Sequence, residues 1–342
     1  MKALFGKAFF QLQWRDLPVP KPQLGQVLVK VEAGGICGTD LHFLRNNEDW
    51  TPLGHEVVGT IEQIGEGVDD FLIGKSVIVE NHAACGICKQ CKNGRSLYCE
   101  NLTTYMSDQA GFSEYLVVRQ DMVHLYDKKQ LDLLHACLAE PLTVALDVTL
   151  RAELELNDEV VVFGPGPIGL MVVRLVKLRG ARRVFLVGSN RSTPRGAHRL
   201  ELGNQMGADL TLSYEKDDIV SKIMSAVPTG VDRVIVTAPP KTIIDAIKIS
   251  RFGGIIAFNG IEYGMGSQIT FDANEFHFKK LQLRASHAIP NHYFPIAIDL
   301  LNRCDLPLEA LISHVLPFEE AEKAFRIASD QQKPVVKVIL KP

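Results

Sequence analysis

The segment from residue 159 to residue 180 limits the fold of this chain more than any other stretch. It reads EVVVFGPGPIGLMVVRLVKLRG, a β-branched run joined by a glycine-rich turn to an amphipathic helical pattern that ends in glycine. In such a turn the first glycine permits the bend, the second lets a pyrophosphate approach the backbone, and the third lets helix and strand pack closely. The turn predicts a dinucleotide site formed by Gly164, Gly166, Pro167, Ile168 and Gly169.

The alternation of strand and helix continues beyond this turn. Strand-like runs occupy residues 183–188, 209–213, 232–237 and 254–260, and helical patterns such as residues 241–254 lie between them. Alternating strands and helices form a parallel sheet with helices on both faces. This half of the chain is therefore predicted to be a doubly wound α/β domain.

The part of the chain before residue 150 has a different pattern. Short β-branched runs separated by Gly, Pro and Asp turns predict a β-rich domain, with strands at residues 26–35, 57–65, 75–80 and 112–118. The end of the chain, residues 334–342, is again strand-like. We expect this tail to complete the first domain, so that the α/β domain is an insertion.

Length and charge limit the remaining possibilities. A chain of 342 residues suggests about two domains, and we expect limits at 1–146 and 147–286, with 287–342 returning to the first domain. The net charge of -3 provides no basic surface for nucleic acid or an anionic membrane. The apolar runs are too short to span a bilayer, and MKALFGKAFF is too short for a secretory signal. The expected location is the cytoplasm, and the expected partner is a small molecule.

Four cysteines form a compact cluster with the spacing Cys-x2-Cys-x2-Cys-x7-Cys. In a reducing compartment such a cluster indicates a metal site more often than disulfides. Four thiolates without histidine suit a closed tetrahedral zinc site with no position left for chemistry. A disulfide pair or a redox centre is the alternative. The interpretation is a structural zinc lobe, at about residues 81–101, held by Cys85, Cys88, Cys91 and Cys99.

A second set of metal-ligating residues is spread over three segments of the β-rich half. GGICGTDLH contains Cys37, PLGHEVVG contains His55, and CLAEPLTVALD contains Glu140. Three protein ligands would leave one zinc position open for water or substrate, which is the mark of a catalytic site. Cys137 is a rival for the third ligand, and Glu56 is a further acid beside the histidine.

Together these motifs, in this order, resemble the zinc-dependent medium-chain dehydrogenase/reductase family over essentially the whole chain. The resemblance implies a GroES-like catalytic domain and a Rossmann coenzyme domain. It implies that Cys37 and His55 hold a catalytic zinc, that Glu140 matches the third-ligand position, and that Glu56 also coordinates zinc in some relatives. The four clustered cysteines match the structural zinc, which makes two zinc ions per chain.

The resemblance also narrows the branch and implies a proton relay. A glutamate at position 140, where classical alcohol dehydrogenases carry cysteine, is similar to the polyol and sugar dehydrogenases near sorbitol, galactitol-phosphate and threonine dehydrogenases. Thr39 and His42 match the family's relay, and Asp40 is expected to support the metal ligands. Zinc would act as a Lewis acid on a hydroxyl while hydride moves to a nicotinamide.

The loop after the second α/β strand bears on the choice of coenzyme. Between Val184 and Glu201 the chain has no Asp or Glu to hold the adenosine ribose hydroxyls. A missing carboxylate removes repulsion against a 2'-phosphate, which Ser189, Asn190 and Arg191 are expected to bind, with Arg195 nearby. The sequence therefore favours NADP over NAD, the alternative being NAD bound through backbone contacts.

The substrate pocket is expected to differ from that of the relatives. Only residues 38–54 separate Cys37 from His55, so FLRNNEDWT is predicted to be a shortened loop, with Phe43, Arg45 and Trp50 either lining the pocket or packing elsewhere.

The sequence predicts oxidation of a polyol, sugar or other secondary alcohol. The alternatives are an NADPH-dependent carbonyl reductase and a non-catalytic dinucleotide-binding protein. Relatives suggest a homodimer or homotetramer.

Overall fold

The computed structural model describes residues 1–303 and 305–342, so Cys304, within the predicted return segment, lies outside the described residues. The chain forms two compact units. Unit 1 consists of residues 1–143, 289–330 and 337–342, and unit 2 of residues 144–288 and 331–336. Helix α4 (Ala139–Arg151) runs from the first unit into the second.

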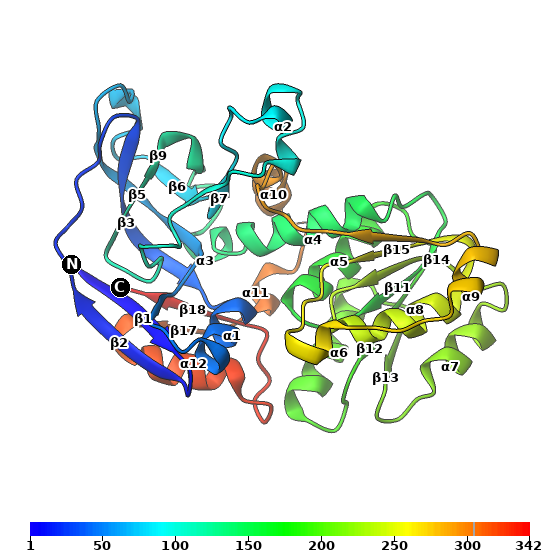
Figure 1. Cartoon of the computed structure of the whole chain (residues 1–342). Helices are drawn as coiled ribbons and strands as arrows, with labels where there is room; N and C mark the ends of the chain where they lie inside the picture. The colour runs from blue at the N-terminus through cyan, green and yellow to red at the C-terminus, as the bar shows by residue number, and fades with distance from the viewer. Residues whose placement is uncertain (304) are drawn as a thin grey trace. The chain divides into compact units, whose positions relative to one another are not determined.

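Unit 2 is built on a parallel sheet with the strand order β13-β12-β11-β14-β15-β16 (Figure 1). Central strand β11 is buried throughout and pairs with β12 and β14, as expected of a parallel strand covered on both faces. This is the predicted doubly wound fold. The strands are β11 (Glu159–Phe163), β12 (Arg183–Gly188), β13 (Leu210–Ser213), β14 (Val231–Val236), β15 (Ser250–Phe258) and β16 (Gln282–Ala285).

Four helices of unit 2 pack as two pairs, α5 with α6 and α7 with α8. Pro167 begins α5, where its fixed φ suits the first turn, and α6 is followed by Gly207 in the left-handed conformation. The helix predicted over 241–254 is shorter, because Ser250 already pairs with Val231 in the sheet. The helices are α5 (Pro167–Leu178), α6 (Pro194–Met206), α7 (Ile219–Ala226), α8 (Ile243–Ile249) and α9 (Ala273–Phe278), with short 3-10 turns η4 (Pro240–Thr242) and η5 (Gly264–Ser267).

Unit 1 contains a seven-stranded sheet with the order β10-β6-β5-β3-β18-β17, and β9 also pairs with β3. The tail strand β18 runs antiparallel to β3, with Ile339 opposite Gly35. The end of the chain therefore completes the sheet that begins near residue 26. The strands are β3 (Gln26–Gly35), β5 (Glu56–Ile64), β6 (Ser76–Val79), β9 (Tyr115–Arg119), β10 (Val123–Leu125), β17 (Ile312–Pro317) and β18 (Lys337–Lys341).

Smaller elements complete unit 1. A three-stranded sheet has the order β2-β1-β4, and β7 pairs with β8. In the part of the chain that the structure describes, no helix has both the length and the apolar composition needed to cross a membrane. These elements are β1 (Lys2–Lys7), β2 (Gln11–Asp16), β4 (Thr51–Pro52), β7 (His82–Ala83), β8 (Thr103–Thr104), α1 (Gly38–Asn46), α2 (Lys89–Lys92), α3 (Leu133–Ala136), α10 (Phe294–Asn302), α11 (Leu308–Leu311), α12 (Ala321–Ser329), η1 (Asp70–Leu72), η2 (Ser96–Tyr98), η3 (Gln120–Met122) and η6 (Phe318–Glu320).

The segment predicted to be a shortened loop is partly helical. Helix α1 extends to Asn46 and includes Phe43 and Arg45, so only residues 47–50 are irregular before β4. The helix begins where the Asp40 carboxylate accepts the Cys37 backbone N–H at 2.8 Å, a capping contact that the spacing Cys-Gly-Thr-Asp allows.

One of the two aromatic residues of this segment, Trp50, packs within unit 1. Trp50 lies against the buried cluster of Ala3, Phe5 and Ala110, and the Arg15 guanidinium lies 5.4 Å from its ring centre. These contacts favour the packing alternative for Trp50 over a role in the substrate pocket.

Candidate metal centres and coenzyme site

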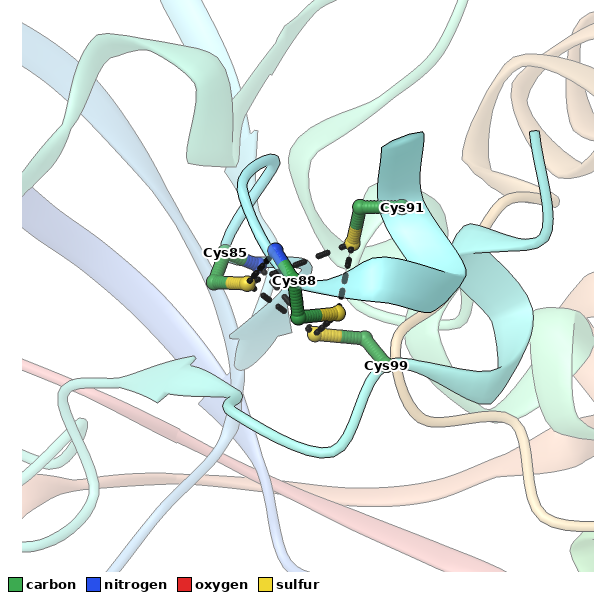
Figure 2. A group of neighbouring side chains, drawn as sticks. All are labelled: Cys85, Cys88, Cys91 and Cys99. Carbon is green, nitrogen blue, oxygen red and sulfur yellow. Dashed lines mark hydrogen bonds between the residues drawn. The ribbon is translucent and has the colours of Figure 1, made fainter. Parts of the chain in front are cut away.

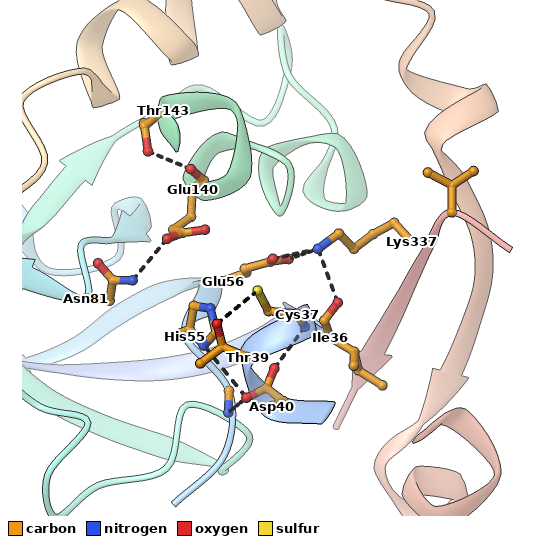
Figure 3. A network of polar contacts seen from close by, with 12 residues as sticks. Ile36, Cys37, Thr39, Asp40, His55, Glu56, Asn81, Glu140, Thr143 and Lys337 are labelled. Carbon is orange, nitrogen blue, oxygen red and sulfur yellow. Dashed lines mark hydrogen bonds and ion pairs between the residues drawn. The ribbon is translucent and has the colours of Figure 1, made fainter. Parts of the chain in front are cut away.

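Three of the predicted ligands come together in unit 1. The ligand atoms of Cys37, His55 and Glu56 all lie within 4.8 Å of one another (Figure 3). Cys37 directly precedes α1, His55 directly precedes β5, and Glu56 is the first residue of β5. Strands β3 and β5 are antiparallel neighbours with Gly35 opposite Glu56, so their pairing brings the two segments together.

Glycine at position 35 leaves room for the Glu56 carboxylate. A Cβ atom at this position would lie 2.0 Å from Glu56 Oε2. Gly54, directly before His55, has a φ of 92°, and its backbone N–H donates to Asp40 Oδ1 at 3.0 Å. Both glycines therefore shape the site without contributing a side chain.

Asp40 supports the histidine ligand from a fully buried position. Its Oδ1 lies 3.7 Å from His55 Nδ1, a buried nitrogen that makes no hydrogen bond to any described residue. Burial would raise the pKa of Asp40, but His55 and the amides of Cys37 and Gly54 hold it below its usual value. For His55 the effects have the opposite sign. Burial would lower its pKa, but the charges of Cys37 and Asp40 raise the pKa of His55 well above its usual value.

Glu56 is paired with a buried cation that the sequence analysis missed. Lys337 Nζ lies 2.5 and 2.6 Å from the two Glu56 oxygens and donates to the Ile36 carbonyl at 3.1 Å (Figure 3). Burial would lower the pKa of Lys337, but the charges of Glu56 and Cys37 raise it above its usual value. The available signal was a lysine inside the apolar run VVKVIL.

Glu140 and Cys137 lie outside this group of three, as far as the described residues extend. Glu140 Oε1 accepts a hydrogen bond from Asn81 Nδ2 at 3.0 Å, and burial raises the pKa of Glu140 to about 7. The Cys137 thiol is buried and donates to the Leu133 carbonyl. The structure thus groups Glu56, rather than either alternative, with Cys37 and His55.

Two hydrogen-bonding groups flank these ligands. Thr39 Oγ1 lies 3.7 Å from Cys37 Sγ. Further along α1, Asn46 Nδ2 lies 2.9 Å from Nδ1 of His42, which is one helical turn before it. If the amide N–H donates here, His42 Nδ1 is an acceptor and the neutral ring carries its proton on Nε2. Asn46, which sequence reasoning missed, therefore selects the tautomer of the predicted relay histidine.

A buried tyrosine completes the polar surroundings. The Tyr105 hydroxyl has no hydrogen-bond partner among the described residues. Burial raises the pKa of Tyr105 well above its usual value, and the charges of Glu140, Asp40 and Glu56 add to this effect. An unsatisfied buried hydroxyl in the field of these carboxylates is a candidate donor to a ligand.

The four clustered cysteines face one another in the lobe between β7 and β8 (Figure 2). Their closest sulfur–sulfur distances run from 3.5 to 4.0 Å, and none of these cysteines forms a disulfide. A tetrahedron with metal–sulfur bonds of about 2.3 Å has edges of about 3.8 Å. The backbone N–H groups of Cys85 and Cys88 point at neighbouring sulfurs. Both the donors and their spacing fit zinc.

The glycine turn of unit 2 has the shape that the sequence predicts. Gly164 has a φ of 104°, and a Cβ at Gly169 would lie 1.8 Å from the Gly164 carbonyl oxygen. In contrast, a Cβ at Gly166, directly before Pro167 and Ile168 in the first turn of α5, would meet no protein atom within 4 Å. The open space at Gly166 fits the close approach of a pyrophosphate.

The loop after β12 contacts an acid that lies outside the loop and that the sequence analysis did not consider. Its residues 184–200 contain no acid, but the Glu215 carboxylate lies against the loop and accepts the N–H groups of Arg191 and Ser192. The Arg191 guanidinium donates to Thr211, and the Asn190 side chain accepts N–H groups of its own loop. Ser189 is exposed. The loop itself carries no Asp or Glu, as the sequence shows, but an acid from beyond the loop lies against it.

Comparisons with known proteins agree on the two parts of the chain. The model of the alcohol dehydrogenase GroES-like domain matches residues 23–128, and the model of the zinc-binding dehydrogenase family matches residues 167–303. L-threonine 3-dehydrogenase of Bacillus subtilis (strain 168) is 32% identical over 358 residues, which cover 100% of this chain and 99% of the relative. Sorbitol dehydrogenase of the same strain is 30% identical over 354 residues, which cover 100% of this chain and 97% of the relative.

Solved structures give the same match. A short chain alcohol dehydrogenase (rspB) from E. coli CFT073, complexed with cofactor NADH, has a TM-score of 0.90 at 28% identity and covers 100% of this chain and 99% of its own. Galactitol-1-phosphate dehydrogenase from Escherichia coli has a TM-score of 0.88 at 25% identity and covers 100% of both chains.

Proposed function

The chain belongs to the zinc-dependent medium-chain dehydrogenase family, and from this premise we propose that it oxidises a secondary alcohol of a polyol, sugar or amino alcohol with a nicotinamide coenzyme. The observation that carries the proposal is the grouping of Cys37, His55 and Glu56 in unit 1. The names of the relatives, threonine, sorbitol and galactitol-1-phosphate dehydrogenase, support a substrate with a hydroxyl on a secondary carbon and further polar groups.

Zinc fits both clusters. A thiolate, an imidazole and a carboxylate would hold one ion at Cys37, His55 and Glu56, and the four clustered cysteines would hold another. At the first site zinc supplies a Lewis acid that lowers the pKa of a bound hydroxyl group. Asp40 orients His55, Lys337 holds Glu56, and Asn81 holds Glu140 close by as a second acid.

The proton of the substrate hydroxyl needs a path through protein groups. Thr39 and His42 project from neighbouring turns of α1, and residues three apart share one helix face. The Thr39 hydroxyl both donates and accepts, and the half-exposed His42 can pass a proton to water. We therefore assign proton transfer to this pair, with Asn46 fixing the His42 ring.

A pair of glycine substitutions tests the coenzyme turn. Gly169→Ala should destabilise the fold by about 1–3 kcal/mol, because the new methyl overlaps the Gly164 carbonyl. Gly166→Ala should cost less than about 1 kcal/mol, because its methyl meets no protein atom, but should weaken coenzyme binding about tenfold. Thermal melting and coenzyme titration measure the two effects separately. Equal coenzyme affinity of Gly166→Ala and wild type would contradict this role for the turn.

The function itself is tested by absorbance at 340 nm with zinc-loaded protein. Polyols, sugars, their phosphates, L-threonine and simple secondary alcohols are assayed with NAD+ and NADP+, and the corresponding carbonyl compounds with NADH and NADPH. We expect turnover with at least one polyhydroxy or amino alcohol, and its loss when a chelator removes the metal. Reduction without measurable oxidation would favour the reductase hypothesis. If neither oxidation nor reduction is detected with two zinc ions bound, the proposed substrate class is rejected.

A further inference from the structure

The loop that follows β12 is positioned by an acid from outside that loop. Glu215 Oε2 accepts the backbone N–H of Arg191 at 2.9 Å and that of Ser192 at 3.0 Å. These two amides follow the end of the second parallel strand of unit 2 by only a few residues. In folds of this kind an acid near this place holds the adenosine ribose of the coenzyme.

The sheet register explains how Glu215 reaches the loop. Strands β12 and β13 are parallel neighbours with Gly188 opposite Ser213, and the Tyr214 N–H donates to the Gly188 carbonyl at 3.0 Å. The chain segments that leave the two strands therefore start side by side at the carboxyl edge of the sheet. Ligands of doubly wound folds bind at this edge.

The donors that a 2'-phosphate would need are already engaged within unit 2. The amides of Arg191 and Ser192 bind Glu215, while Arg191 Nη2 donates to the Thr211 carbonyl at 2.7 Å and to its hydroxyl at 2.9 Å. Asn190 Oδ1 accepts the Ser192 N–H at 2.7 Å. A phosphate arriving here would have to displace a carboxylate and release a guanidinium.

The charge of Glu215, like the hydrogen bonds around it, disfavours a 2'-phosphate at this loop. The Ser192 hydroxyl, followed by the two loop amides, lowers the pKa of Glu215 below its usual value, so this carboxylate is ionised at neutral pH. A phosphomonoester carries about -1.5 to -2 charges at pH 7 and would be repelled by it. Ribose hydroxyls are donors, and a carboxylate with about four acceptor positions retains capacity for one of them after binding the Ser192 hydroxyl and the two amides.

We propose that Glu215 takes the place of the acid absent from the loop after β12, and that it makes coenzymes without a 2'-phosphate the preferred ones. The inference rests on the proposed function, because it requires that unit 2 bind a nicotinamide dinucleotide. It differs from the expectation of NADP, which considered only the residues of the loop itself.

Titration of the zinc-loaded full chain with NADH and with NADPH, followed by coenzyme fluorescence, tests this assignment without any substrate. The wild type should bind NADH at least about tenfold more tightly than NADPH, and Glu215→Gln should shift the affinity ratio about tenfold toward NADPH. The amide keeps an acceptor oxygen for the loop amides, so the loop should keep its position, while NADH affinity should fall because the charged acceptor for the ribose hydroxyls is lost. Glu201→Gln, an exposed acid on α6, is the matched control and should leave the ratio unchanged.

Salt separates a charge effect from a structural one. Because repulsion between exposed charges is screened, discrimination by the wild type should shrink between about 0.05 and 0.5 M NaCl, and that of Glu215→Gln should not. A ratio that is the same in wild type, Glu215→Gln and a second variant, Glu215→Ala, all with wild-type melting curves, would overturn the assignment. Failure of the wild type to bind either coenzyme would instead reject the proposed function, and the assignment with it.

Discussion

The Lys337→Met variant is expected to lose about 10- to 100-fold in kcat/KM, the range typical when the partner of a metal ligand is removed. Lys337 Nζ contacts both oxygens of Glu56, and the side chains of the pair are 3% and 0% exposed. Removing the cation leaves a buried carboxylate without its counter-charge, a change that typically costs about 3–5 kcal/mol. It also frees Glu56 to change its distance from Cys37 and His55, so zinc retention should fall.

A loss of activity alone would not show whether Lys337 positions Glu56 or whether its removal destabilises unit 1 as a whole. Zinc content after dialysis against a weak chelator, and the melting temperature of the metal-free protein, are therefore measured on the same samples. Lys337→Arg keeps the charge and should recover most of the zinc retention and kcat/KM. Lys341→Met removes a cation from the same strand and should resemble the wild type. If Lys337→Met keeps wild-type zinc retention and activity, Lys337 does not position Glu56.

The parts of the fold that the sequence predicts are those with local signals. In EVVVFGPGPIGLMVV the strand, the turn and the helix are each specified by neighbouring residues, and the structure has β11 and α5 at these places. The four cysteines lie within fifteen positions, so their spacing alone brings the sulfurs together. The paired strands β3 and β5 likewise follow two β-branched runs, and their register places Glu56 near Cys37.

Apart from Asn46, which contacts His42 one helical turn away, the missed residues depend on contacts between distant parts of the chain. Lys337 is 281 positions from Glu56, and Asn81 is 59 positions from Glu140. Glu215 reaches the loop after β12 only through the register of β12 with β13, and no pattern within residues 184–200 reports it. Register follows from which strands pair across a sheet, which local periodicity does not reveal.

The helix at the start of the predicted loop could have been predicted from a local signal in the sequence. Cys37 and Asp40 have the three-residue spacing of a capping pair, and the backbone contact between them begins α1. Trp50 shows the opposite case, since only the position of β1 and its cluster of Ala3 and Phe5 decides that the ring packs there.

If both proposed zinc sites are filled, Cys91→Ser is expected to reduce the bound zinc from two ions per chain to one and to lower the melting temperature of the loaded protein. None of residues 84–102 is buried, and Ile87 and Tyr98 in this segment are 76% and 58% exposed. The lobe thus has no hydrophobic core, and the ribbon β7–β8 at its base is two residues long on each side. Metal binding is the one large source of stability left to it, worth about 10–16 kcal/mol in isolated zinc-finger peptides.

Loss of this ion should affect the fold more than the chemistry. The ligands of the Cys37 cluster are Cys37 directly before α1, His55 directly before β5 and Glu56 at the start of β5, and none of them belongs to the lobe. The zinc content of this site and kcat at low temperature should therefore stay within about threefold of wild type. Each kcal/mol lost should lower the melting temperature by about 2–4 °C in a domain of 150 to 250 residues. Cys137→Ala removes a cysteine outside both clusters and should keep two zinc ions. A Cys91→Ser protein that retains both ions and the full melting temperature would show that the four sulfurs do not stabilise the lobe through zinc.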